Sequence, residues 1–174
     1  MKYALVLMAV LALAAFASTE FGAHAGLFIP TGRWSNTDVG NEDSVDYGAS
    51  PMIGANVLIH MPMYAIEGSI SYVFLSSNQD YPDMSTSMIP VMAGIRTYSG
   101  TIFYGGGLAY HIHRFSWSED GQEEGIEGSE EFVGAYGNIG TILPMGGNDI
   151  ELSGKLHWID FDEFCLTATA GINF

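Results

Sequence analysis

Four ionisable residues of opposite charge have spacings that suit ion pairing better than catalysis. Glu67 and Arg96 lie near the same ends of two neighbouring apolar segments, and Glu151 and Lys155 are four residues apart in a third segment. Residues an even number of positions apart share one face of a β-strand. Because a buried charge is costly unless it has a partner, we interpret these residues as a charged network inside a closed sheet. Separate ion pairs with trapped water are the alternative.

The histidines have the same parity as these charges. They are His24, His60, His111, His113 and His157. A metal site needs convergent ligands at bonding distance, which alternation alone does not show. We therefore predict hydrogen bonding inside the sheet, with no metal and no cofactor. The single cysteine, Cys165, excludes an intramolecular disulfide and a multi-cysteine zinc site, and we interpret it as a small packing residue.

Two further kinds of site have simpler explanations. Ser116 near His113 comes closest to a nucleophile and base, but no third residue that would orient the base is evident. The acidic segments 41–43 and 118–131 offer oxygen ligands for Ca²⁺, yet neither has the EF-hand spacing. Solvated loops that repel one another explain this acidity. We predict no enzymatic activity.

Composition excludes several classes of protein. The 174 residues include 5 Lys plus Arg against 20 Asp plus Glu, a formal net charge of −15, so the chain lacks the basic surface that nucleic acid requires. With 48% hydrophobic and 14% charged residues, the composition is not that of a disordered chain. The length suits one domain.

The first segment predicts export. Lys2 precedes an apolar run over 4–16, and small residues at 15 and 17 have the spacing of a cleavage site. This run is too short to span a membrane as a helix. We predict a signal peptide over 1–17 and one mature domain over 18–174.

The remaining sequence alternates in hydropathy with a period of two. We predict eight strands, at about 20–30, 51–61, 64–75, 88–98, 101–115, 131–143, 149–158 and 163–174. Their connections are alternately long and short, a pattern typical of outer-membrane barrels, in which the short turns face the periplasm.

Sorting the strands by parity separates an apolar face from a polar one. The first includes Ile70, Leu152 and Ile172, and the second carries the four charges, the histidines and many glycines. Glycine weakens a strand on a solvated face, but small residues help to fill a narrow eight-stranded interior. Aromatic residues of the apolar face also gather in two groups near the strand ends, as in interfacial girdles. They are Phe21, Tyr64, Tyr104 and Phe174 at the short-turn end, and Tyr72, Phe74, Trp158 and Phe164 at the long-loop end.

The whole mature chain resembles the small outer-membrane β-barrel proteins of the eight-stranded OmpA/OmpX-like kind. The resemblance rests on the signal peptide, the opening strand over 21–30 and the closing strand over 166–174. A terminal aromatic residue preceded by alternating apolar residues is similar to that family's assembly signal. Here the signal would comprise Phe174, Ile172, Ala170 and Leu166. The resemblance implies insertion by the outer-membrane assembly machinery.

These observations predict an all-β fold, an eight-stranded antiparallel up-and-down transmembrane β-barrel. We expect a monomeric integral protein of a bacterial outer membrane, in contact with its lipid, with a plugged lumen and a structural or surface-interaction role. The first alternative is a soluble secreted or periplasmic β-barrel that binds an apolar ligand. The second is a lipid-processing outer-membrane enzyme.

Overall fold

The computed structural model describes residues 18–31, 36–38, 44–75, 84–117, 126–146, 148–159 and 163–174, so the predicted signal peptide lies outside the described residues. The structure contains ten strands. They are β1 (Ser18–Ile29), β2 (Asn36–Asp38), β3 (Ser44–Asp46), β4 (Ser50–His60), β5 (Ala65–Leu75), β6 (Met84–Ser99), β7 (Ile102–Trp117), β8 (Ile126–Met145), β9 (Asn148–Ile159) and β10 (Glu163–Asn173).

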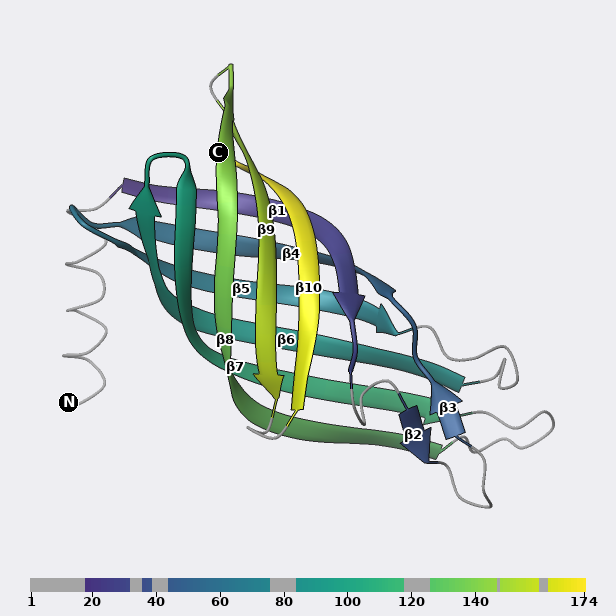
Figure 1. Cartoon of the computed structure of the whole chain (residues 1–174). Coiled ribbons are helices and arrows are strands. Elements are labelled where there is room, and N and C mark those ends of the chain that lie inside the picture. The colour runs from purple at the N-terminus through teal and green to yellow at the C-terminus, as the bar shows by residue number, and fades with distance from the viewer. Residues whose placement is uncertain are drawn as a thin grey trace.

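Eight of these strands form one closed antiparallel barrel, which confirms the predicted fold class. The order around the barrel is β1-β10-β9-β8-β7-β6-β5-β4, with β1 also paired to β4. Figure 1 shows the strands wound around one axis, with the first and last barrel strands side by side. Phe21 and Phe174 close this seam through two backbone hydrogen bonds of 3.1 and 2.9 Å. Every barrel strand therefore has two neighbours, and none of these eight strands has an open edge.

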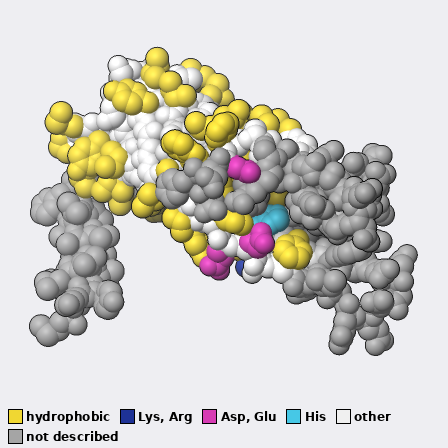
Figure 2. All heavy atoms as spheres, turned by 60° about the horizontal axis from the view of Figure 1, so that its bottom comes forward, with side chains coloured by type: hydrophobic (Ala, Val, Ile, Leu, Met, Phe, Trp, Pro, Cys, Tyr) yellow, Lys and Arg dark blue, Asp and Glu magenta, His cyan; other side chains and the backbone are white. Residues whose placement is uncertain are grey.

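The apolar face of the sheet is the outside of the barrel, as the sequence predicts. Ile70, Leu152 and Ile172 are 52%, 43% and 40% exposed, whereas Glu67 and Lys155 are 1% and 7% exposed. Figure 2 shows hydrophobic side chains across the outside of the barrel. A soluble barrel that binds an apolar ligand would have the opposite arrangement, so the structure does not support that alternative.

The outward aromatic residues occupy both ends of the strands, as predicted. At the short-turn end Phe21, Tyr64, Tyr104 and Phe174 are 40–67% exposed, and at the other end Tyr72, Phe74, Trp158 and Phe164 are 39–52% exposed. Amphipathic and aromatic rings are favoured where hydrocarbon meets the polar headgroups. The two groups therefore mark the upper and lower limits of the apolar band.

Three tight connections share one end of the barrel, at residues 61–64, at residues 100–101 and between β8 and β9. Gly100 and Gly146 have φ values of 65° and 60°, the left-handed conformation that two-residue hairpin turns require. At the other end, three of the four connections are longer and span 30–49, 76–83 and 118–125, whereas the one between β9 and β10 spans only 160–162. The first of these connections carries β2 and β3, which form a separate two-stranded sheet. This small sheet is seen at the lower right of Figure 1, at the long-loop end of the barrel.

Several barrel strands extend further than their hydropathy pattern. The strand predicted over 88–98 spans Met84–Ser99, and the one predicted over 131–143 spans Ile126–Met145. Their additional residues lie mainly at the long-loop end, where the sequence is polar on both faces. Backbone pairing continues there although hydropathy no longer alternates. The alternation therefore predicts the extent of the apolar band and not the full length of the strand. The described part of the chain contains no helix with the length and apolar character that a membrane crossing requires.

Candidate functional site

The four charges predicted to face inward lie together in the lumen, near the short-turn end. We call Glu67, Arg96, Glu151 and Lys155 the ion network. The Arg96 guanidinium donates to Glu67 through Nη2 at 2.9 Å and through Nε at 3.3 Å. It also donates to Glu151 through Nη1 at 2.5 Å and through Nη2 at 3.2 Å. One planar cation therefore binds two carboxylates from different strands, a geometry that only arginine provides.

Lys155 contacts the more buried of the two acids. Its Nζ donates to Glu67 Oε1 at 3.1 Å, although Glu151 is the acid on its own strand. Asn138 Nδ2 donates to Glu67 Oε2 at 3.0 Å, and Asn173 Nδ2 donates to Glu151 Oε2 at 3.3 Å. The network thus connects β5, β6 and β9 across the lumen, and Asn138 and Asn173 link it to β8 and β10. Its two acids and two bases sum to zero formal charge.

Aromatic rings complete the surroundings of the two cations. The Arg96 guanidinium carbon lies 4.0 Å from the centroid of the Phe103 ring, and Lys155 Nζ lies 5.8 Å from that of Tyr136. A ring face attracts a cation while excluding water. Arg96 is 1% exposed and Phe103 is 0% exposed, so this level of the lumen is filled by side chains.

A histidine layer lies further along the lumen. His111 Nε2 is 3.3 Å from His157 Nδ1, and His157 Nε2 is 3.3 Å from Thr167 Oγ1. His24 Nε2 is 3.0 Å from Ser71 Oγ on the other side of the barrel. Among the described residues, no group of three or more His, Cys, Asp or Glu side chains is arranged to hold a metal ion. These contacts are the hydrogen bonds expected of lumen histidines.

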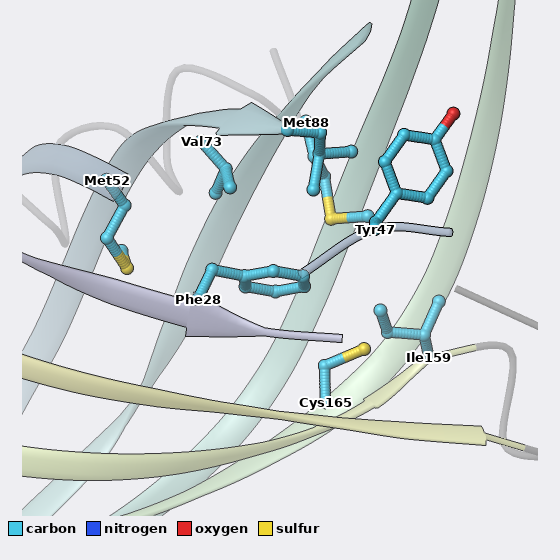
Figure 3. Packing of buried hydrophobic residues seen from close by; sticks show 8 residues of the cluster. Phe28, Tyr47, Met52, Val73, Met88, Ile159 and Cys165 are labelled. Atoms are coloured by element: carbon cyan, nitrogen blue, oxygen red, sulfur yellow. The ribbon is translucent and has the colours of Figure 1, made fainter. Parts of the chain in front are cut away.

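The long-loop end of the lumen is apolar. Figure 3 shows the Phe28 ring among side chains from several strands. We call this group the apolar lumen cluster, and its buried members are Phe28, Tyr47, Met52, Val73, Leu75, Met88, Ile159 and Cys165. Tyr47 comes from the connection between β3 and β4, and its hydroxyl lies 3.3 Å from Thr86 Oγ1. The first long connection therefore contributes a side chain to the filling of the barrel.

Sequence reasoning missed this cluster because it sorted apolar residues to the outside. Phe28, Met52 and Met88 are at positions whose parity points inward. Each lies within a mostly apolar stretch, so hydropathy alone does not show which face of the strand its side chain occupies. Cys165 is buried, as expected of a packing residue. The available signal was parity alone, since strict alternation places Phe28 on the same face as His24.

Other candidate residues are not brought together. His113 is buried in the lumen, whereas Ser116, three residues later on β7, lies on the opposite face of the sheet. Ser116 and His113 therefore lie on opposite faces of β7, which is not the arrangement of a nucleophile and its base. The acidic segment 41–43 and residues 118–125 of the segment 118–131 lie outside the described residues.

The proposed assembly-signal residues all face outward, three of them on β10 and Phe174 directly after it. Phe174, Ile172 and Leu166 are 67%, 40% and 45% exposed, and Ala170 lies on the same face. These side chains form an apolar row along the outer face at the strand that closes the barrel.

Solved structures with the same architecture identify the fold. The Neisserial surface protein A structure matches with a TM-score of 0.56 at 10% identity, covering 90% of this chain and 97% of that chain. This is the fold of the small outer-membrane β-barrels. The small barrel of Ail, the attachment invasion locus protein of Yersinia pestis, matches with a TM-score of 0.51 at 14% identity, covering 91% of this chain and 97% of that chain.

The N-terminal barrel domain of Pseudomonas aeruginosa OprF is a third example. It matches with a TM-score of 0.50 at 10% identity, covering 91% of this chain and 99% of that chain. No protein-family model and no curated protein match the sequence. The likeness therefore lies in the small-barrel fold and not in shared sequence motifs.

Proposed function

We propose that the chain is an integral protein of a bacterial outer membrane with a plugged lumen, and that its role is structural or surface-interacting, without catalysis. The single observation that carries the proposal is the inverted distribution of polarity. The four members of the ion network are 1–9% exposed, while 26 large hydrophobic side chains among the described residues are 36–85% exposed. Only a hydrocarbon environment makes such an exterior favourable.

Two kinds of contact support the plugged lumen. Near the short turns, Arg96 spans the interior between Glu67 and Glu151 and lies against Phe103. Near the long connections, the apolar lumen cluster fills the same interior. An eight-stranded barrel leaves a space that side chains can fill, so ions and solutes have no continuous aqueous path.

Export and assembly complete the proposal. The predicted signal peptide over 1–17 would direct the chain out of the cytoplasm, and the outer-membrane assembly machinery would recognise the apolar row that ends at Phe174. The barrel closes on its own first strand, so a monomer is self-sufficient.

Refolding into lipid tests the proposal. The mature chain is diluted from urea into phosphatidylcholine vesicles, floated on a density gradient and run on gels with and without boiling. We expect flotation, faster migration of the unboiled sample and no steady current in planar bilayers. A protein that stays soluble without lipid or detergent would contradict the membrane location, and a stable ohmic current would contradict the plugged lumen.

A further inference from the structure

One basic side chain of the barrel faces outward. The described residues contain three Lys and Arg side chains, of which Arg96 and Lys155 lie in the lumen. The third, Arg114, is exposed and follows the buried His113 on β7. It pairs across the sheet with Ser87 on β6 and Ser129 on β8, so it belongs to a polar row on the outer face.

The position of Arg114 along β7 places it at the edge of the apolar band. Tyr104, an outward residue of the short-turn aromatic group, precedes it by ten positions on the same face. Ten residues of strand at about 3.3 Å each, tilted by about 40°, rise roughly 25 Å, which is the height of the apolar band of such barrels. Arg114 therefore lies where the phosphates of the outer leaflet begin.

A polar hollow surrounds this guanidinium. Ser87, Ser116 and Ser129 line it together with Arg114, and Tyr72, Phe115 and Gly128 complete the lining. The hollow has a volume of about 620 Å³. Serine hydroxyls and a guanidinium are hydrogen-bond donors that suit phosphate oxygens, since arginine presents its N–H groups in a fork that fits them.

Arg114 has no acidic partner in the described part of the chain. Within it, each ion pair formed by Lys or Arg involves Arg96 or Lys155. The nearby outward acid Glu131 instead accepts a hydrogen bond from the Tyr110 hydroxyl. A guanidinium at the level of the headgroups, without an acidic partner among the described residues, could bind an anion supplied by the membrane.

We propose that Arg114, with Ser87, Ser116 and Ser129, binds the phosphate of an anionic lipid in the outer leaflet. A lipid phosphate fits better than a soluble one. The protein has a formal net charge of −15, which repels anions from solution, whereas acyl chains packed on the outer face hold a lipid phosphate at the level of Arg114. The proposal rests on the membrane location proposed above.

Lipid selectivity in bilayers tests this site. The mature chain is refolded into phosphatidylcholine vesicles that contain a trace of spin-labelled phosphatidic acid or spin-labelled phosphatidylcholine. The fraction of motionally restricted label gives the relative affinity for the two lipids. We expect the parent to prefer phosphatidic acid about fivefold, and R114Q to show no preference, because one interfacial basic residue contributes an effect of this size. R114K, which keeps the charge, should retain an intermediate preference.

A matched control separates a local site from general electrostatics. M63E makes the same change in net charge at the opposite rim, where Met63 is 85% exposed in the turn between β4 and β5. We expect M63E to keep the parental preference. An unchanged preference in R114Q, or an equal loss in M63E, would overturn the site. Loss of the preference on adding inorganic phosphate at constant ionic strength would also overturn it, because the ligand would then be soluble phosphate.

Flotation is measured on every sample before the spectra. If no variant floats with the vesicles, the proposed membrane location fails. If all variants float and R114Q still selects phosphatidic acid, only the lipid site fails.

Discussion

Replacing Arg96 by methionine should strongly destabilise the barrel. R96M removes all four hydrogen bonds to Glu67 and Glu151 while keeping a long apolar side chain against Phe103. Glu67 keeps its hydrogen bonds from Lys155 and Asn138, but among the described residues the only other side-chain hydrogen bond of Glu151 comes from Asn173 at 3.3 Å. Breaking a buried ion pair by removing one partner costs about 3–5 kcal/mol, so we expect a loss of that size.

A double variant and a matched single variant test the reason for this loss. R96M/E151Q leaves one acid, Glu67, with one base, Lys155, and should recover most of the stability, since removing both charges of a buried pair is close to neutral. R114M makes the same side-chain change on the outer face and should cost less than about 1 kcal/mol. The free energy of unfolding is measured by urea titration of the folded barrel in vesicles, with tryptophan fluorescence and gel mobility as readouts.

Two results would refute the reasoning. If R96M were within about 1 kcal/mol of the parent, Arg96 would not be a paired buried charge. If R96M/E151Q were no more stable than R96M, the loss would come from packing and not from the uncompensated carboxylate.

Further predictions concern backbone packing in the lumen and assembly. G94A should cost about 1–3 kcal/mol in urea titrations, because an added Cβ would lie 2.4 Å from a backbone oxygen, whereas G137A, with 3.9 Å of space, should cost much less; equal losses would contradict this packing. F174S should lower the amount of protein in the outer membrane of expressing cells but not the refolding yield in detergent. F164S, which alters an outward aromatic residue at the other end of β10, should leave both quantities near the parental values; equal defects would argue against a signal at the C-terminus.

The barrel could be predicted because the alternation of hydropathy within each strand shows, without reference to the other strands, which residues share a face. Alternation along β9 assigns Leu152 and Leu156 to one face and Glu151 and Lys155 to the other, and the same split recurs around the sheet. Which face meets hydrocarbon followed from the glycines and the aromatic groups. The structure agrees with this assignment of faces because each strand residue of a closed barrel points either into the lumen or to the outside.

The contacts within the lumen could not be predicted from parity. The sequence places Glu67, Arg96, Glu151 and Lys155 on one face, but the preference of Lys155 for Glu67 depends on strand stagger and tilt. These quantities are set by the closure of the whole barrel. The insertion of Tyr47 was also beyond the sequence, because it comes from a connection and not from an alternating strand.

The most direct test of the account measures whether the outer face of the barrel is surrounded by hydrocarbon or by water. Spin labels are placed at I70C and L152C in a Cys165→Ser background, and the protein is refolded into vesicles. We predict strong collisions of both labels with oxygen, which concentrates in hydrocarbon, and weak collisions with a water-soluble nickel chelate. The opposite accessibility would place Ile70 and Leu152 in water and contradict the account.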